Sequence, residues 1–200
     1  SIADAFNVMN KKLSESTVSL TVMKKIVEDR TKVLEQLSNT DPLTKVANRR
    51  ALFERASTEF IRSKRNQEKL TILLLDCDLF KKFNDDFGHA FGDELLVHLC
   101  KLCKQEIRDV DLLARYGGEE FIIMLPSCDI NGGIEIAKRI QISLAKNQLE
   151  TKGQKVSVTL SIGVSTLSEQ HQNFEALIHD ADLAMYQAKE NGRNRIEIAP

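Results

Sequence analysis

Residues 112–125 read LLARYGGEEFIIML, and this stretch decides the fold. Two apolar runs, 112–115 and 121–125, flank a Gly-Gly pair, and glycines tolerate the positive φ angles of a tight turn. The pattern predicts a β-hairpin with buried strands and adjacent carboxylates, Glu119 and Glu120, at its tip. Neighbouring carboxylates repel each other, a cost that a bound divalent cation removes. The alternative interpretation is an ordinary solvated turn that binds no cation.

Helices and strands alternate on either side of this hairpin. The apolar spacing predicts helices at residues 49–64, 92–108, 133–146 and 174–191, an apolar strand at 70–75, a β-rich run at 156–166 and a last strand at 195–199. With the hairpin, these elements form a βαββαβ core with additions. The predicted fold class is therefore α/β, an α+β sandwich with a mixed central sheet and flanking helices.

The N-terminal residues 1–38 carry a different pattern. Apolar side chains recur in alternating steps of four and three, at Ile2, Phe6, Met9, Leu13, Leu20, Met23, Val27, Leu34 and Leu37. Heptad spacing predicts a coiled-coil helix that forms a homodimer; the alternative is one amphipathic helix packed on its own domain. Pro42 cannot continue the helix, so a second domain is expected over 39–200. Because the chain begins at Ser1 in helix-like sequence, we expect a domain upstream.

Composition restricts the possible partners. The chain has 200 residues, of which 42% are hydrophobic and 28% charged, with 28 basic against 29 acidic residues and a net charge of −1. That balance creates no overall field that favours nucleic acid or an anionic membrane. No apolar run approaches the roughly 20 residues of a membrane span, and no signal-peptide layout precedes the domain. We expect a cytoplasmic protein without nucleic-acid or membrane contact.

The cysteines do not form the pattern of a disulfide framework. Cys100 and Cys103 are a CxxC pair with His98 nearby, so zinc has to be considered. Their spacing with Leu96 and Leu99 is helical, however, and places both thiols on a buried apolar face. Core packing is the favoured interpretation.

An acidic cluster follows the apolar strand. Asp76, Cys77 and Asp78 stand where that strand leaves its sheet, with Lys81 in reach of a phosphate oxygen. We expect the two acids to point to opposite faces, one to hold a hard cation and the other to support the turn. A lone DxD is common and does not by itself indicate a metal site.

A third cluster is polar and rich in glycine, at Asn84, Asp85, Gly88-His89 and Gly92-Asp93. It reads as a link that opens a helix, where free N–H groups attract anions. Asp93 has the alternative role of a helix N-cap.

Taken together, these motifs resemble the GGDEF-domain family, the diguanylate cyclases, over residues 39–200. The matching segments are Asp41-Pro42-Leu43-Thr44, Asn48-Arg49, Asp76-x-Asp78-x-Phe80-Lys81, Asn84-Asp85-x-x-Gly88-His89-x-x-Gly92-Asp93, Arg115 to Phe121, Ser161-Ile162-Gly163, Ala181-Asp182-x-Ala184-x-Tyr186-x-Ala188-Lys189 and Gly192-Arg193-Asn194. The signature here is GGEEF, with Glu119 where many members carry Asp. Cys77 replaces the usual Ile or Val.

The resemblance implies a nucleotidyl-cyclase-like core that condenses two GTP into cyclic di-GMP at the interface of two domains. It implies Mg²⁺, with Mn²⁺ able to substitute, held by Asp76, Glu119, Glu120 and the backbone carbonyl of Cys77. An upstream sensor is also implied. The competing functions are a catalytically inactive module that binds GTP or cyclic di-GMP and a purely structural dimerisation domain.

The same resemblance implies roles for further residues. Lys81, Lys189 and Arg193 would neutralise the triphosphate, and Asn84 and Asp93 would read the guanine edge. The remaining substrate-site residues are Phe80, Gly117 and Gly118, and the implied catalytic residues are Glu119, Asp76 and Lys81.

A further motif lies outside this site. Arg108 and Asp111 resemble the family's RxxD inhibitory site for the product cyclic di-GMP, and Arg139 matches its second arginine. Judged alone, Arg and Asp three residues apart are more often a surface ion pair.

Overall fold

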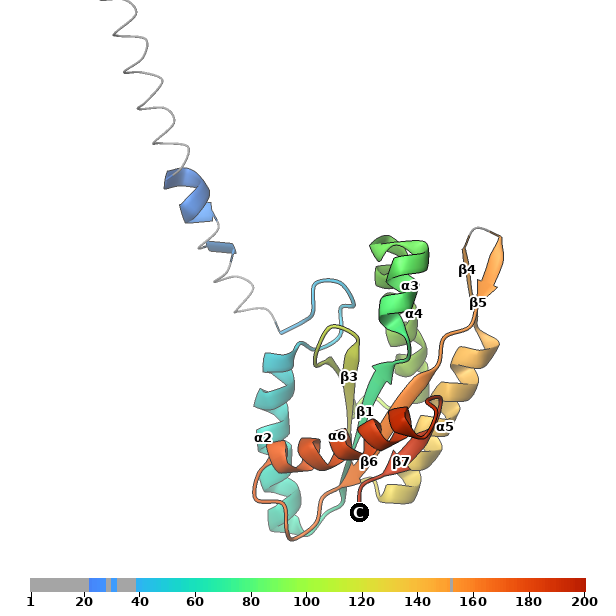
Figure 1. Cartoon of the computed structure of the whole chain (residues 1–200). Helices are drawn as coiled ribbons and strands as arrows, with labels where there is room; N and C mark the ends of the chain where they lie inside the picture. Colours follow the sequence, from blue (N-terminus) through green and yellow to red (C-terminus); the bar gives the residue numbers. More distant parts are fainter. Residues whose placement is uncertain (1–21, 28–29, 32–38, 152) are drawn as a thin grey trace, which may run out of the picture. The chain divides into compact units, whose positions relative to one another are not determined.

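The computed structural model describes residues 22–27, 30–31, 39–151 and 153–200 (Figure 1). The chain divides into two compact units, Ser1–Asn39 and Thr40–Pro200. In the first unit, residues 22–27 and 30–31 are helical, and the predicted seam residues Met23 and Val27 are exposed. The other apolar seam positions lie outside the described residues, so the coiled coil stays a prediction.

A five-stranded sheet in the order β2-β3-β1-β6-β7 forms the centre of the second unit. All neighbouring strands pair antiparallel except β6 and β7, which are parallel. The predicted mixed sheet and βαββαβ core are therefore confirmed. The strands are β1 Leu70–Cys77, β2 Leu112–Arg115, β3 Glu120–Pro126, β6 Leu160–Thr166 and β7 Ile196–Ile198.

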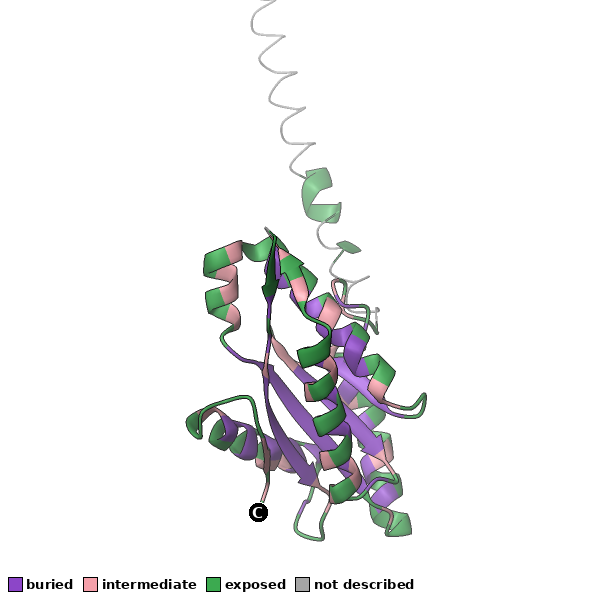
Figure 2. Ribbon diagram, turned by 90° about the vertical axis from the view of Figure 1, so that its right-hand side faces the viewer, coloured by how far each residue is buried: buried purple, intermediate pink, exposed green. Residues whose placement is uncertain are grey.

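Helices cover both faces of this sheet, α2 and α6 on one and α4 and α5 on the other (Figure 1). Residues of β1 alternate between the two cores: Leu73 and Leu75 join the core under α4 and α5, while Ile72 and Leu74 join the core under α2 and α6. Both faces of the central strands are buried (Figure 2). The helices are α2 Arg49–Asn66, α3 Phe80–Phe87, α4 His89–Glu106, α5 Ile130–Lys146 and α6 Phe174–Glu190.

Side-chain caps fix where three of these helices begin. Asn48, Asp129 and Asn173 each accept a hydrogen bond from the backbone N–H three residues ahead, at 2.9, 2.8 and 2.8 Å. Such a cap contributes about 1 kcal/mol. In the described parts of the chain, no helix is both long enough and apolar enough to cross a bilayer.

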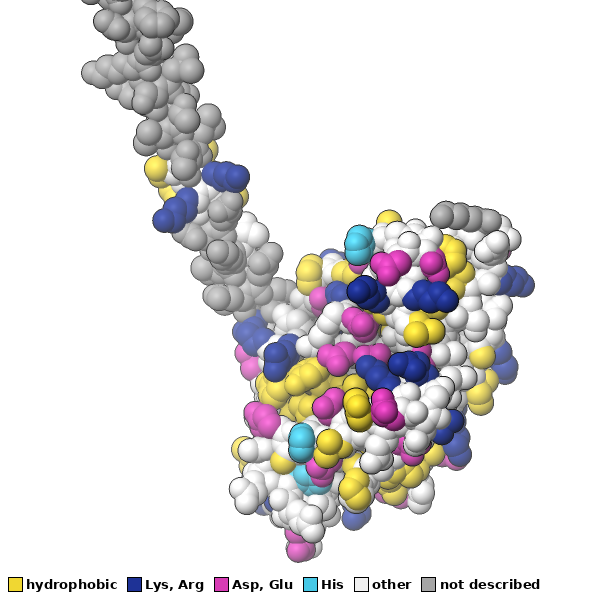
Figure 3. Space-filling view, viewed as in Figure 1, with side chains coloured by type: hydrophobic (Ala, Val, Ile, Leu, Met, Phe, Trp, Pro, Cys, Tyr) yellow, Lys and Arg dark blue, Asp and Glu magenta, His cyan; other side chains and the backbone are white. Residues whose placement is uncertain are grey.

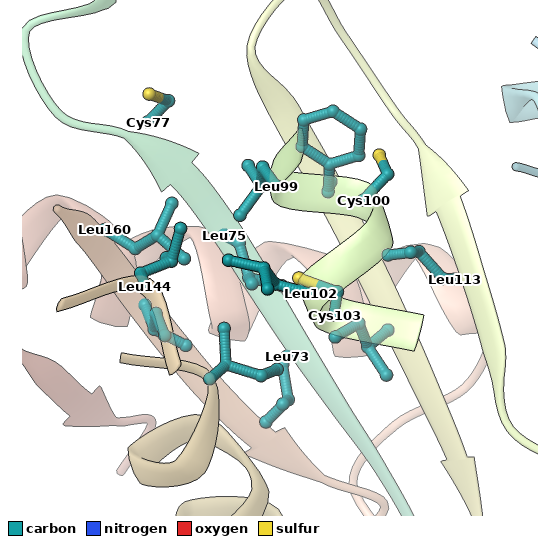
Figure 4. Close-up of a cluster of buried hydrophobic side chains, with 14 of the residues drawn as sticks. Leu73, Leu75, Cys77, Leu99, Cys100, Leu102, Cys103, Leu113, Leu144 and Leu160 are labelled. Carbon is teal, nitrogen blue, oxygen red and sulfur yellow. The ribbon is translucent and has the colours of Figure 1, made fainter. Parts of the chain in front are cut away.

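The CxxC pair belongs to the core, as its helical spacing predicts. Cys100 and Cys103 are buried on α4 beside Leu75, Leu99 and Leu113 (Figure 4). Burial raises the pKa of the Cys100 thiol to about 12 and raises the pKa of Cys103 as well. Both side chains are therefore neutral thiols, whereas metal binding needs the thiolate.

The link predicted before the helix at 92–108 is wrong, because residues 80–87 are themselves the helix α3. Phe80, Phe83 and Phe87 pack partly buried against the core at helical spacing, and the charged residues between them are exposed. Gly88, at φ 89°, separates α3 from α4. Because α4 begins at His89, Asp93 lies inside this helix and is not its N-cap.

The predicted β-rich run at 156–166 is also divided. Strand β5, Gln154–Val156, pairs with β4, Leu149–Thr151, in a separate two-stranded sheet, and only β6 joins the main sheet. The alternation of apolar and polar residues runs unbroken over 156–164, so it does not show where the run divides.

Candidate active site

Acidic residues from two strands meet at one end of the sheet. Asp76 in β1 is the register partner of Glu120 in β3, and the Cys77 N–H donates to the Glu119 carbonyl at 3.3 Å. Asp76 is buried, while Glu119 and Glu120 are half-buried. The residues predicted to hold a cation therefore come from one continuous edge. Acidic and basic side chains intermix on the face that carries α6 (Figure 3).

The electrostatics of this edge favour a bound cation. Burial raises the pKa of Asp76, although Lys189 opposes the shift with its Nζ 2.7 Å from Asp76 Oδ2. Burial also raises the pKa of Glu120, and the charge of Asp76 raises it further. Raised pKa values mean that the ionised carboxylates are under-compensated, and a divalent cation compensates them.

The donor set has the chemistry of a hard-cation site. Carboxylate and carbonyl oxygens are the ligands that Mg²⁺ prefers. Among the residues that the structure describes, no three acidic, histidine or cysteine side chains are already gathered closely enough to hold an ion. The edge fits a cation whose remaining ligands come from water or from a bound phosphate group, as is usual for Mg²⁺.

The two acids of the DxD segment share one side of the sheet, so the prediction of opposite faces is wrong. Asp76 contacts Lys189 from α6, and Asp78 accepts from Ser161, whose β6 neighbours Leu160 and Ile162 face the opposite core. Residues two apart in extended chain point the same way. Their tasks still differ, because the carboxylate of Asp78 is occupied by hydrogen bonds within the protein.

Arg115 holds the hairpin tip in place. Its Nε and Nη2 donate to the Gly118 carbonyl at 3.0 and 2.7 Å, and its Nη1 lies 3.2 Å from Asp41 Oδ1. A Cβ at Gly117 would collide with the Glu120 carboxylate, so this position has to be glycine while Glu120 keeps its orientation. Asp41 and Arg115 both occur in the sequence motifs, but nothing local to either residue indicates that they form an ion pair.

Helices α3 and α4 bring together the residues predicted to read guanine. Asn84 on α3 lies against Gly92 on α4, where a Cβ would collide with Asn84 Oδ1 and approach Phe80 to 3.2 Å. In the described part of the chain, Asn84 Oδ1 is the one buried side-chain oxygen or nitrogen without a hydrogen-bond partner. Asp93 is exposed in the next position. An unpartnered amide oxygen beside a free carboxylate suits a ligand with N–H donors.

The predicted phosphate-binding cations come from two helices. Lys189 lies in the last turn of α6, and Arg193 in the turn that follows, close enough to lower the pKa of Asp76. Lys81 is exposed in the first turn of α3, which begins directly after the acidic end of β1. Lys189 and Arg193 therefore lie near Asp76, and Lys81 follows it in the chain by five residues.

Comparison with known proteins agrees with this geometry. The profile of the family described as diguanylate cyclase, GGDEF domain, matches residues 38–195. The chain belongs to the GGDEF-domain family. The diguanylate cyclase DgcP of Pseudomonas aeruginosa is 40% identical over 164 residues, which are 82% of this chain and 24% of that protein. The chain thus spans about a quarter of the length of that relative.

Solved GGDEF structures show the same fold. The active GGEEF domain of a diguanylate cyclase from Vibrio cholerae is 35% identical, with a TM-score of 0.73, over 78% of this chain and 98% of that chain. The GGDEF domain of DgcB from Caulobacter crescentus, in complex with c-di-GMP, is 27% identical, with a TM-score of 0.78, over 81% of this chain and 96% of that chain.

The RxxD residues of this GGDEF domain lie at the end of α4. Arg108 Nη2 is 3.2 Å from Asp111 Oδ1, and the Arg108 side chain is 57% exposed, whereas the Asp111 side chain is fully buried. Arg139 on α5 bonds Glu106, two residues before Arg108, with its Nε 3.1 Å from Oε2. Both arginines thus lie near the same helix end. Because the buried Asp111 carboxylate is paired with Arg108, the arginine is the residue of this pair that a ligand can reach from solvent.

Proposed function

We propose that this chain is a diguanylate cyclase that joins two GTP into cyclic di-GMP and releases two pyrophosphates. The observation that carries the proposal is the pairing of Asp76 with Glu120 across β1 and β3, with Lys189 beside them. Carboxylates with raised pKa values next to a lysine suit a metal-bound triphosphate. An inactive binding module is not favoured, because the residues expected to hold metal, phosphate and guanine are all present.

The chain's own residues divide the work. Diguanylate cyclases of this family generally use divalent metal ions, and here Mg²⁺ would be held by Asp76, Glu119, Glu120 and the Cys77 carbonyl, with Mn²⁺ as a substitute. The ion supplies charge compensation for the triphosphate. The β- and γ-phosphates are bound by Lys81 of α3, by Lys189 of α6 and by Arg193 in the turn after α6. Positioning and electrostatic stabilisation of this kind provide most of the catalysis in phosphoryl transfer.

The base is held between α3 and α4. Asn84 Oδ1 accepts a hydrogen bond from guanine, and the Asp93 carboxylate accepts from guanine N1–H and the exocyclic amine. Adenine has no N1–H, so Asp93 would face an acceptor instead. A side chain at residue 92 would collide with Asn84 Oδ1 and press on Phe80, so glycine at this position leaves the amide oxygen in place.

The reaction joins two such sites. In each step, the 3′-oxygen of one GTP bonds to the α-phosphorus of the other, the bond to pyrophosphate breaks, and Glu119 takes up the hydroxyl proton. One domain carries one half of the site, so two domains have to face each other. A parallel coiled coil over residues 1–38 raises their effective concentration; the exposed apolar Met23 and Val27 support this role.

We also propose feedback inhibition by the product. The exposed Arg108 guanidinium presents a fork that matches guanine O6 and N7, with Arg139 as the second arginine. Asp111 orients Arg108 in the free protein. When the product binds, the Asp111 carboxylate accepts from guanine N1–H and the exocyclic amine in place of Arg108.

The test is the incubation of the protein with GTP and Mg²⁺, followed by measurement of pyrophosphate and chromatographic identification of the nucleotide product. We expect cyclic di-GMP and pyrophosphate in a ratio of one to two. Binding of GTP without turnover would contradict the proposal.

A further inference from the structure

Asp78 is a buried carboxylate that accepts from three donors in two segments. It is 4% exposed, and its Oδ2 accepts from Thr159 Oγ1 at 2.7 Å and from the Asn194 N–H at 3.0 Å. Its Oδ1 accepts from Ser161 Oγ at 2.7 Å. Thr159 and Ser161 flank the start of β6, while Asn194 lies beyond α6. One side chain therefore ties the end of β1 to two distant parts of the chain.

The segment that Asp78 holds has an unusual backbone. Gly192, Arg193 and Asn194 have φ angles of 106°, 61° and 48°, three successive residues in the left-handed region. Side-chain-bearing residues adopt that region at a cost, and persist there only when the surroundings fix them. The Arg193 N–H bonds the Ala188 carbonyl at 2.9 Å, which fixes one end of the turn. The bond from the Asn194 N–H to Asp78 fixes the other end.

This turn decides where Arg193 is placed. Arg193 is exposed, and its guanidinium acts electrostatically on Asp76. Arginine has many rotamers, so its backbone position matters for the phosphate that it can reach. Without the bond from Asn194, the strained turn is free to relax to ordinary φ values.

We propose that Asp78 is a positioning residue for the triphosphate: it fixes the turn 192–194 and thereby holds Arg193 toward the carboxylate edge. The inference rests on the proposed GTP substrate. The two acids of the DxD segment then have different roles. Asp76 faces Lys189 and the cation edge, whereas three donors occupy the oxygens of Asp78. Asp78 acts through Arg193 and touches neither phosphate nor metal.

Three variants test this role through steady-state kinetics with GTP. Asp78→Ala should raise the KM for GTP about tenfold and change kcat less, as expected for loss of a hydrogen bond to a charged acceptor. Asp78→Asn keeps one acceptor oxygen and should recover most of that loss. Thr159→Val is the matched control, because it removes a donor to the same carboxylate and leaves the Asn194 bond; its KM should stay within about twofold.

A double variant separates positioning from general stability. If Asp78 acts through Arg193, adding Asp78→Ala to Arg193→Ala should change the KM by less than about twofold, because interacting residues are not additive. Multiplicative effects in the double variant, or an equal KM rise in Thr159→Val, would overturn the proposal.

Hydrogen exchange gives a readout that does not need turnover. Amides of residues 192–195 should exchange faster in Asp78→Ala, and to a smaller extent in Asp78→Asn, while the β1 amides stay protected. If Asp78→Ala does not fold, Asp78→Asn carries the exchange comparison. Unchanged exchange in the turn contradicts the inference, even if the wild type makes cyclic di-GMP. A different result would contradict only the proposed function: the wild type does not turn over GTP, while Asp78→Ala exchanges faster in the turn and binds Mg²⁺–GTP more weakly by calorimetry. The role of Asp78 in positioning Arg193 would then still hold.

Discussion

Asp76 of β1 stands directly opposite Glu120 of β3 in the antiparallel sheet. Like charges opposite each other destabilise a strand pair, and burial adds to this cost. The pKa of each carboxyl is raised in the folded chain. The repulsion between these carboxylates therefore lowers the stability of the metal-free domain, and a bound cation would restore that stability.

Glu120→Gln should stabilise the metal-free protein. Because the folded-state pKa of Glu120 lies above the ordinary glutamate value of 4.5, the folded chain holds this proton to higher pH than the unfolded chain. Stability is then lost as pH rises from 4.5 through the raised pKa, and the loss is complete above it. We expect a Tm rise of about 1–2 °C at pH 8, a value discounted because the group is partly exposed.

The control is pH 4, where both states are largely protonated and the gain should vanish. Glu54→Gln, an exposed carboxyl on α2, serves as the matched variant. Scanning calorimetry at both pH values measures the difference. A lower Tm for Glu120→Gln at pH 8, or an equal gain at pH 4, would show that the carboxylate is not under-compensated.

Base choice should depend on Asp93. The wild type should prefer GTP over ATP strongly, and Asp93→Ala should lower kcat/KM for GTP about 100-fold, since a site built to accept from N1–H discriminates through that bond. The neighbouring exposed Glu94→Ala is the control and should retain the preference. Comparable use of ATP by the wild type would contradict the assignment of the guanine site.

Deletion of residues 1–37 should make activity depend on dilution. In the proposed mechanism only the encounter of two domains is productive, and a coiled coil would supply that encounter at an effective concentration near the millimolar range. We expect the rate per protomer of the deleted form to rise steeply with protein concentration, while the full chain stays constant. A deletion whose rate per protomer is high at every dilution would refute the role of the stalk.

Product inhibition should depend on Arg108. Titration of cyclic di-GMP into the wild type should lower kcat without competing with GTP, and Arg108→Ala should weaken the inhibition at least about tenfold through loss of a bidentate contact. Arg62→Ala, which removes an ion-paired arginine from α2, is the control. Equal inhibition of the wild type and Arg108→Ala would show that the motif is only a surface ion pair.

Local patterns predicted most of the fold. The Gly-Gly hairpin and the buried strand at 70–75 have apolar runs bounded by turn residues, and both elements form where expected. Helix α3 was not predicted, because the polar residues Lys81, Asn84 and Asp85 made the segment look like a link even though its phenylalanines have helical spacing. Those phenylalanines make the helix, since they pack against the core.

The parts of the site that depend on tertiary structure were not predictable in the same way. Arg115 and Asp41 lie 74 residues apart, and nothing local to either indicates their ion pair. The same holds for Asp78 and Asn194, 116 residues apart. The family motifs include these residues but do not show which of them contact each other.

The central claim is that the acidic edge of β1 and β3 converts GTP into cyclic di-GMP. The most direct measurement compares the wild type with Asp76→Ala and Glu119→Ala at saturating Mg²⁺, following pyrophosphate and the nucleotide product. The account predicts cyclic di-GMP from the wild type and a loss of at least about 100-fold in both variants, with unchanged circular dichroism. Near-normal product formation by either variant, or no cyclic di-GMP from the wild type, would contradict it.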